Sequence, residues 1–414
     1  MPCEHFLNQA EKAFVILSLS FFTGGIGVGG EGTNPSGLLP AFAITAIRYF
    51  IWVTSGLLLC VRWRNTLITA SRDLLIWVLT AIVLASFLWS DYSAQTLFDS
   101  REIWQMTLFG LYMASRFSLK EQVKLVAWTL TIGAGLSLLF GIALPGIGKH
   151  GADHPGAWKG IYDYKNTLGS LMIIASLSLL LLPIGQRSDR WLKWGGLILA
   201  VALIFLSTSR TSLVISLLLL LMIGFYRKFR WQGRRTIVML NLAGLALGCG
   251  VTFLVSNWVD LIVGLGRDPT LSGRTPMWAM TFNLWQERPW LGFGRGAFWA
   301  DGSKYAFKVG QAIANNFIPP HGHNGFVDLA LDVGIIGLGL FLLSFTIAYI
   351  RALHRAYESY HFADLFPLAY LTFLAMNNMT ESYLIRITNI YWVLFIVVIL
   401  SVKKGSQAGD RGQT

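Results

Sequence analysis

Two histidines, His321 and His323, stand one residue apart directly after two prolines, Pro319 and Pro320. A proline fixes its own φ, donates no backbone hydrogen bond and keeps the preceding residue extended, so we expect the histidines on a stiff, non-helical segment. The apolar run that follows predicts that a helix begins at once. An imidazole, with an ordinary pKa of about 6.5, takes up or releases a proton near neutral pH and also binds metal ions. These residue types in this order predict a functional site.

Two acids follow the histidines inside the predicted helix. Asp328 and Asp332 are four residues apart, so they share one helix face, and in a membrane they are costly unless they face protein or water. One interpretation is a metalloenzyme in which His321, His323 and these acids bind the ion. The acids lie one to two turns into the helix, however, away from an extended His-x-His pair. We therefore expect no metal and no other cofactor, and activity that survives exhaustive chelation would exclude the metal interpretation.

The composition predicts a membrane protein. Of 414 residues, 54% are hydrophobic and 13% are charged, and several apolar runs of about 18 residues or more are long enough to cross a bilayer. The predicted fold class is an all-α integral membrane protein with about twelve transmembrane helices. The predicted spans cover residues 13–30, 38–60, 74–90, 102–117, 123–144, 166–184, 194–209, 212–226, 236–256, 324–350, 363–380 and 387–402.

The basic residues fall in alternate loops, and this pattern predicts the topology. By the positive-inside rule those loops are cytoplasmic, both termini lie inside and the remaining loops face outward. The formal net charge of +12 then reflects topology, and we expect a lipid bilayer and no nucleic acid as partner. No cleavable signal peptide and no disulfide framework are expected. The loops after even-numbered spans hold Arg62, Arg64, Arg72, Arg116, Lys120, Lys124, Arg187, Arg190, Lys193, Arg227, Lys228, Arg230, Arg234 and Arg235.

The large insertion of residues 257–323 is expected to face outward within a single polytopic domain of residues 1–414. Its middle predicts an amphipathic helix that lies on the membrane surface, with Thr275 as N-cap. Arg274 stands at the N-terminus of that helix, where anions are already favoured. The later Gly-x-Gly-x-Gly run, residues 292–296, is interpreted as a tight turn because no strand precedes it. The aromatic residues on one side of the helix are Trp278, Phe282 and Trp285.

Other basic residues near span ends are candidates to bind anions. Arg210 stands in a tight hairpin beside Ser207 to Ser209, and the hydroxyl groups next to the arginine predict an oxyanion pocket. Lys165 and Asn166 open a span, where they bind an anion or cap the helix. Arg48 lies inside a span, so it must face a partner or a water-filled cavity, or else snorkel to the surface.

The loop before Lys165 contains two further histidines, His150 and His154. Their spacing resembles a metal pair. The residues between them include Gly151 and Asp153, and the segment ends in His-Pro-Gly, so a helix that would align the two rings is not expected.

Several of these motifs together resemble the O-antigen ligase superfamily, which includes lipopolysaccharide ligases, O-antigen and exopolysaccharide polymerases and protein O-oligosaccharyltransferases. The most specific match is His323-Asn324, then nine residues, then Gly334 and Gly337 separated by two residues. The resemblance covers nearly the whole chain, and the motif around Lys165 is most similar to the exopolysaccharide-production branch. One departure is Val214, where the family often has leucine four positions after the arginine. The supporting motifs are Ser209-Arg210, Ser272-Gly273-Arg274 with Trp278, and Tyr164-Lys165-Asn166 with Leu168-Gly169.

The resemblance implies a metal-independent, inverting glycosyltransferase in the bacterial inner membrane. Its donor would be a glycan on undecaprenyl pyrophosphate, and its acceptor a hydroxyl group of lipid A-core or of a growing polysaccharide. His323 would be the general base, and Arg210 and Arg274 would bind the pyrophosphate. Lys165, Asn166, His321, Asn324 and Arg48 would support the site. Gly334, Gly337 and Gly339 are expected to let their helix pack closely.

Ligase and polymerase are not separable from the sequence, and we favour a ligase-type enzyme in surface polysaccharide synthesis. A flippase or transporter of the same lipid-linked glycan is a further alternative, suggested by the number of spans and by Arg48 within one of them. The two halves of the chain show no evident repeat, and the ionisable residues gather toward the predicted outer face instead of the midplane, which argues against transport.

Overall fold

The computed structural model describes residues 2–25, 39–228, 234–256, 274–313, 318–359 and 361–402. Their regular structure is helical, apart from an isolated bridge between Lys149 and Trp158, and this confirms the predicted all-α class. The elements are α1 (Pro2–Phe22), α2 (Ala41–Val61), α3 (Trp63–Ala70), α4 (Leu74–Ala85), η2 (Ser86–Leu88), α5 (Ser93–Arg116), α6 (Leu119–Ala143), α7 (Pro145–Gly148), α8 (Lys165–Leu180), α9 (Arg187–Leu206), α10 (Arg210–Lys228), α11 (Arg234–Ser256), α13 (Arg274–Trp285), α14 (Lys304–Gln311), α15 (Gly325–Glu358), η4 (Phe362–Leu365), α16 (Phe366–Asn377) and α17 (Ile390–Ser401).

Each predicted span overlaps a helix, but twelve crossings are not confirmed. Among the described residues, four helices are long and apolar enough to span a membrane: α2, α6, α11 and α15. A fifth results if α3 and α4, which meet at an angle of 93°, form one broken span. α8, α10, α16 and α17 are apolar but shorter. α5 has the length but also carries buried acids, such as Asp99 and Glu102, which the protein interior accommodates.

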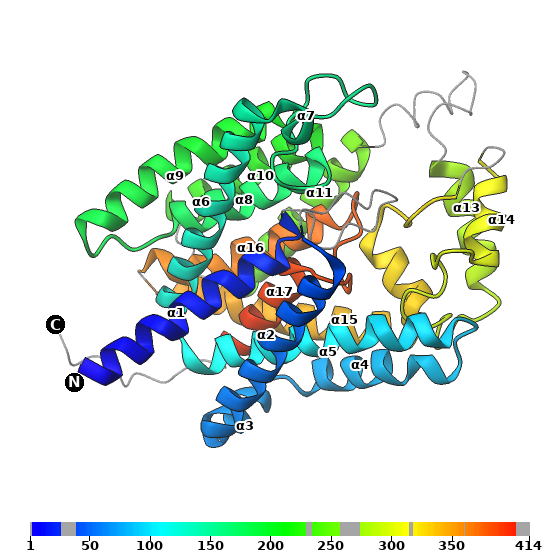
Figure 1. Cartoon of the computed structure of the whole chain (residues 1–414), viewed down its shortest axis with the longest axis horizontal. Coiled ribbons are helices and arrows are strands. Elements are labelled where there is room, and N and C mark those ends of the chain that lie inside the picture. Colours follow the sequence, from blue (N-terminus) through cyan, green and yellow to red (C-terminus); the bar gives the residue numbers. More distant parts are fainter. Residues whose placement is uncertain are drawn as a thin grey trace.

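The basic loops gather at one end of the helix bundle, which we call the basic end. There Glu11 of α1 accepts hydrogen bonds from Arg116 and, at 3.0 Å, from Arg62. Lys124 pairs with Asp189 at 2.5 Å, which joins α6 to the start of α9. Arg62, Arg116 and Lys124, from three of the basic loops, are therefore held by these acids, whereas residues 229–233 lie outside the described part of the chain. In Figure 1, α1 begins at the left, and α13 and α14 lie at the right.

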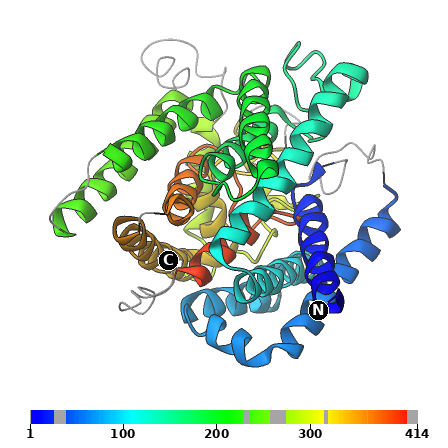
Figure 2. The same cartoon turned by 90° about the vertical axis from the view of Figure 1, so that its left-hand side faces the viewer.

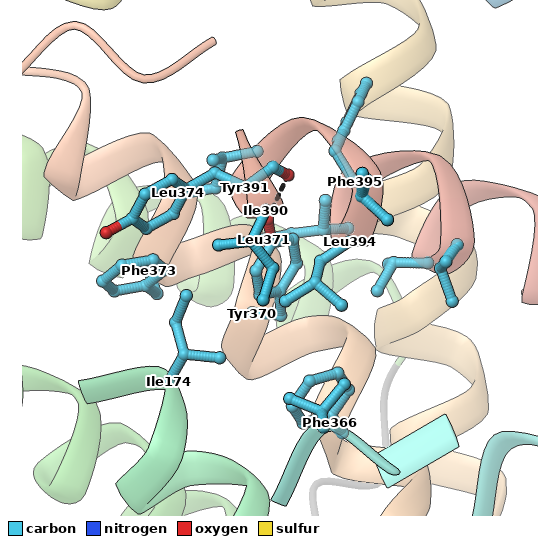
Figure 3. Close-up of a cluster of buried hydrophobic side chains, with 14 of the residues drawn as sticks. Ile174, Phe366, Tyr370, Leu371, Phe373, Leu374, Ile390, Tyr391, Leu394 and Phe395 are labelled. Carbon is cyan, nitrogen blue, oxygen red and sulfur yellow. Dashed lines mark hydrogen bonds between the residues drawn. The ribbon is translucent and has the colours of Figure 1, made fainter. Parts of the chain in front are cut away.

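The core is built around α16 and α17, whose side chains are almost completely buried. Figure 2, seen from the side where α1 begins, shows α17 in red in the middle of the bundle. The Tyr370 hydroxyl donates to the carbonyl of Tyr391 at 2.5 Å, and the two helices pack through aromatic rings and leucines around this bond (Figure 3). Tyr391 also stacks on Tyr383, with ring centroids 4.5 Å apart. The core thus anchors the α16–α17 loop, residues 378–389, at the end opposite the basic end.

α15 is broken in its first half, at Val333 and Gly334. Gly334 has φ +68° and ψ −170°, so the backbone leaves the helical path there and exposes polar groups that a helix would pair. The segment from Pro289 to Gly294 pairs them instead. Phe293 and Gly294 donate to the carbonyls of Leu331 and Asp332 at 2.8 and 3.0 Å, and Ile335 and Ile336 donate to those of Pro289 and Trp290 at 2.8 and 3.3 Å.

This docking explains glycines that the sequence left ambiguous. A Cβ atom on Gly334 would lie 2.1 Å from the carbonyl oxygen of Trp290, and one on Gly292 would lie 2.4 Å from that of Leu331. The expectation that glycines let the helix pack closely is therefore confirmed for Gly334, which also breaks the helix. It is wrong for Gly339, where a Cβ would meet no atom within 4 Å.

A charge cluster holds the same segment against the turn before α5. Asp91 pairs with Arg288 at 2.8 Å and with Lys304 at 2.9 Å, and it accepts a hydrogen bond from the Tyr305 hydroxyl. The hydrogen bonds from Tyr305, Lys304 and Arg288 hold the pKa of the Asp91 carboxyl well below its usual range. The carboxylate is therefore ionised at neutral pH and ties α14 to the bundle.

The break in α15 can be tested with a matched pair of glycine substitutions. Gly334→Ala requires a positive φ and a Cβ within the docked segment, so we expect it to destabilise the protein by at least about 1–3 kcal/mol. Gly339→Ala, in the same helix and in open space, should be neutral or stabilising by up to about 1 kcal/mol. The measurement is the thermal unfolding midpoint in detergent; equal midpoints for the two variants would contradict the role of Gly334.

Candidate functional site

The two histidines lie in a tight non-helical loop, as Pro319 and Pro320 predict. We call residues 318–324 the histidine loop. The backbone N–H of His323 donates to Nδ1 of His321 at 3.2 Å, and the two rings lie with centroids 4.2 Å apart. His323 has φ +51°, which is uncommon for a residue with a side chain. Such strain persists where the surroundings fix the backbone firmly, and it is concentrated at functional sites.

Residues from three elements fix this loop. The Asp328 carboxylate, on the first turns of α15, accepts from the N–H of Gly322 at 3.0 Å and from the indole N–H of Trp299 at 2.9 Å. The indole N–H of Trp278 in α13 donates to the carbonyl of Gly322 at 2.8 Å. Asn324 is the N-cap of α15, since its side chain accepts from the N–H groups of residues 326 and 327. Asp328 and Asn324 therefore position the loop.

The α16–α17 loop connects the start of α15 to the start of α8. Gly325 donates to the carbonyls of Asn378 and Glu381 at 2.9 and 3.0 Å. The side-chain amide of Asn166 donates to the Glu381 carboxylate at 2.6 Å, and the Thr167 and Tyr383 hydroxyls lie 3.1 Å apart. Asn166 is thus structurally linked to the histidine loop, and Lys165 lies next to it.

Lys165 and Arg210 are brought together by helix packing. Gly169 of α8 lies against the α9–α10 hairpin so closely that a Cβ on it would be 2.3 Å from the hydroxyl of Ser212. Across this contact the positive charges of Lys165 and Arg210 repel one another. Arg210 is exposed at the start of α10. Two cations held near each other at helix N-termini favour a bound anion.

Ser207 and Ser209 do not form the predicted oxyanion pocket, whereas Thr208 between them is exposed. Ser207, Ser209 and Ser212 are buried, and their hydroxyls bond within the hairpin: Ser209 Oγ accepts from Ser212 Oγ at 3.0 Å, and Ser207 Oγ accepts from the N–H of Ser209 at 3.3 Å. These bonds shape a turn in which Thr208 has φ +52°. The serines therefore position Arg210 and do not themselves face a ligand.

His150 caps α8. Its Nε2 accepts from the backbone N–H of Lys165 at 3.0 Å, and its Nδ1 lies 3.2 Å from the carboxylate of Asp153. This arrangement requires a neutral ring with the proton on Nδ1. His154 Nε2 bonds to the Tyr164 hydroxyl at 2.5 Å. The spacing of the two histidines thus reflects a cap, and no group of three or more potential metal ligands occurs among the described residues.

Of the three expectations for Arg48, the structure shows a partner inside the protein. Its guanidinium lies 2.7 Å from the carboxylate of Glu102 in α5, whose side chain is 3% exposed. Thr388 of the α16–α17 loop donates to the same carboxylate at 3.4 Å. Arg295 is close enough for its charge to act on Glu102, and it also pairs with Asp332 at 3.2 Å. The structure places Arg48 in this buried charge network.

α13 begins at Arg274, whose side chain lies outside the described residues, as do Ser272 and Gly273. The helix does not present its tryptophans to a membrane surface as predicted. Trp278 and Trp285 donate to the carbonyls of Gly322 and Ala330, at 2.8 and 3.2 Å, so both face the protein. The helix that carries Arg274 is therefore fixed directly to the histidine loop.

A cavity of about 630 Å³ adjoins the histidine loop, with His321 in its wall. Three residues of this region were missed by the sequence reasoning: Arg295, Arg386 and Glu381. Arg295 stands in the middle of the Gly-x-Gly-x-Gly run, and the other two belong to a polar stretch between two apolar helices. The glycine run and the polar stretch are visible in the sequence, but neither shows which residues these side chains contact in the folded protein.

The helices and this polar end define a multi-pass membrane protein with a basic and histidine-containing site. Residues 195–342 match the family described as O-antigen ligase, which confirms the resemblance to the O-antigen ligase superfamily over the part that holds Arg210, α13 and the histidine loop. The exopolysaccharide production protein ExoQ of Rhizobium meliloti (strain 1021) is 31% identical over 112 residues. The match covers 25% of this chain and 25% of the length of that relative. Together these matches support a role in membrane polysaccharide biosynthesis.

The link between α13 and the histidine loop is tested by Trp278→Phe. An aromatic ring is retained, but the Gly322 carbonyl loses its donor. This should destabilise the native conformation of the histidine loop by about 1–3 kcal/mol. We expect amide hydrogen exchange in the histidine loop to become about tenfold faster or more, with a small change in melting temperature. Trp290→Phe, at an exposed ring, is the control; equal exchange rates in both variants would contradict the link.

The His150 cap predicts a pH dependence. Burial lowers the pKa of His150 below its ordinary value, although Asp153 opposes this. A histidine with a lowered folded pKa stabilises the protein fully above about pH 6.5, and this stability is lost as the pH falls through the folded pKa. We expect the melting temperature to drop between pH 7 and pH 5, and a smaller drop in His150→Gln. An unchanged drop in that variant would contradict the cap as its source.

Proposed function

We propose that this protein is an inverting, metal-independent glycosyltransferase of the O-antigen ligase type in the bacterial inner membrane. It transfers a glycan from undecaprenyl pyrophosphate to a hydroxyl acceptor, lipid A-core or a growing polysaccharide. The basic end lies in the cytoplasm, with both termini, and the histidine loop faces the periplasm. The observation that carries the proposal is the connection of the Lys165–Arg210 pair to the histidine loop through Asn166, Glu381 and Gly325.

In this proposal the leaving group is bound by arginine. Negative charge develops on the pyrophosphate as the bond from its oxygen to the sugar breaks, and guanidinium groups stabilise it through paired hydrogen bonds. Arg210 and Arg274 take this role, supported by Lys165. The structural position of Arg210, exposed beside Lys165 at the start of a helix, suits an anion on a membrane lipid.

His323 acts as the general base. It removes the proton of the acceptor hydroxyl while that oxygen attacks the sugar carbon, so a single displacement inverts the configuration at that carbon. His321 supports it, because its Nδ1 accepts the N–H of His323 and holds the strained backbone. Asn324 caps α15 beside it. A positioned general base contributes roughly 10²- to 10⁴-fold.

A second candidate function is a polymerase of exopolysaccharide repeat units. The name of the ExoQ relative, an exopolysaccharide production protein, favours it. The polymerase uses the same donor chemistry and differs in the acceptor. The transporter alternative loses its main support, since Arg48 is paired with a buried glutamate and the motif that suggested a transport path is a structural ion pair.

The assignment is tested by transfer from purified lipid-linked glycan in membranes. We expect His323→Ala to lower the rate about 10²- to 10⁴-fold and Arg210→Ala to lower it about 10²- to 10³-fold. His354→Ala, on α15, and Arg190→Ala, on α9, both far from the histidine loop in sequence, are the matched controls with full activity. A chelator should leave the rate unchanged. Full transfer by His323→Ala would exclude His323 as the base.

A further inference from the structure

The cavity beside the histidine loop has the size of a ligand site. Its volume of about 630 Å³ lies within the range of roughly 300–1,000 Å³ that is typical of small-molecule pockets. Four parts of the chain line it: the first turns of α5, residues 295–302, the histidine loop with the start of α15, and residues 382–387. Walls from segments so far apart in the chain meet here because α15 and the α16–α17 loop are fixed to one another.

The charge of the lining argues against a phosphate ligand. By residue type the lining holds four aspartates and two arginines, so acidic side chains outnumber basic ones. Such a lining favours an uncharged ligand over a pyrophosphate. Among the described side chains, Lys165 and Arg210 do not line the cavity, so the proposed anion site is separate. The charged lining residues are Asp99, Asp301, Asp328, Asp332, Arg295 and Arg386.

The polar groups of the wall suit a ligand with many hydroxyl groups. Asp328 and Asp332 already accept hydrogen bonds from Gly322 and Gly296 and serve the fold. Asp99, Gln95 and Asp301 remain at the surface of the cavity. Gln95 and Asp301 are exposed, and the side-chain amide of Gln95 is oriented by its hydrogen bond to Asp99 at 2.8 Å. Carboxylate and amide oxygens accept several hydrogen bonds each. A ligand that carries several hydroxyl groups supplies the donors that these oxygens accept from.

Trp299 gives the cavity a flat apolar wall. Its indole N–H is fixed by Asp328 at 2.9 Å, so the ring cannot turn freely. An aromatic ring of fixed orientation packs well against the C–H face of a sugar ring, while polar neighbours bond to the hydroxyls at its edge. His321 shares this wall, and its ring centroid is 4.2 Å from that of His323. A sugar in the cavity therefore lies beside the histidine pair.

We propose that this cavity is the acceptor site, and that it binds an uncharged, hydroxyl-rich saccharide between Trp299 and the side chains of Gln95, Asp99 and Asp301. The proposal rests on the proposed function, because it assigns the second substrate of that reaction. The donor pyrophosphate then binds at Lys165 and Arg210, and the two substrates approach the histidine loop from different sides.

The test is direct binding to the purified full-length protein, by titration calorimetry in detergent. Two saccharide probes are used: the repeating-unit oligosaccharide of the host's lipid-linked glycan and the core oligosaccharide of its lipopolysaccharide, both freed of lipid and phosphate. Inorganic pyrophosphate is the third probe. We expect at least one saccharide to bind, and Gln95→Ala and Asp301→Asn, at exposed wall positions, each to weaken it about tenfold.

Trp299→Leu should weaken saccharide binding further, and its melting temperature shows whether the fold is retained. Glu287→Gln, an exposed carboxylate outside the cavity, should leave it unchanged. Pyrophosphate binding should be weakened by Arg210→Ala and unaffected by Gln95→Ala or Asp301→Asn. The identity of the saccharide that binds also separates a polymerase from a ligase.

The proposal is overturned if neither saccharide binds, if binding is insensitive to both mild wall variants, or if those variants weaken pyrophosphate binding instead. The proposed function has a separate readout, which is transfer by the same preparation. Saccharide binding that follows the wall variants, together with no transfer from lipid-linked glycan, would refute the glycosyltransferase while supporting the acceptor site.

Discussion

The position of the histidine loop depends on a set of backbone hydrogen bonds formed across the break in α15. Four such bonds join the segment from Pro289 to Gly294 to residues on both sides of Gly334. Backbone groups left unpaired in an apolar environment cost several kcal/mol each, so a break in a membrane helix requires such a partner. The first turns of α15 thereby become a short helix fixed at its end by this segment and at its start by the α16–α17 loop. The histidine loop continues from that helix.

Buried charges hold the same end together. Arg48 with Glu102, and Arg295 with Asp332, join α2 to α5 and residues 292–296 to α15. Removing one member of a buried pair leaves an uncompensated charge, which typically costs about 3–5 kcal/mol. Such pairs therefore fix which helices meet more than they increase stability. This explains why the apolar helices tolerate acids and arginines at this end, whereas the ion pairs at the basic end lie nearer the surface.

Local rules were sufficient for part of this structure. Hydrophobic periodicity located the helices, two prolines predicted a non-helical histidine loop, and the cost of a charge in a span made a partner one of three expected outcomes for Arg48, with a water-filled cavity and snorkelling. They did not identify Glu102 as that partner, because the pairing joins separate helices. Gly334 was interpreted as a packing residue only. The break that it makes in α15 depends on hydrogen bonds to residues 289–294, which a local sequence pattern does not show. The tryptophans of α13 were assigned to a membrane surface because an amphipathic pattern does not distinguish lipid from protein.

The place of His323 at the start of α15 bears on the proposed reaction. It directly precedes the N-cap Asn324, so its backbone is fixed between the start of the helix and the bond to His321. Asp328, in the first turn, holds the same loop through Gly322 and Trp299. In the proposed reaction, Lys165 and Arg210 bind the charged donor, and the cavity, in whose lining acids outnumber bases, takes the uncharged acceptor. A single site of uniform charge would attract one substrate and repel the other, so the proposal assigns the two substrates to separate surroundings near one histidine.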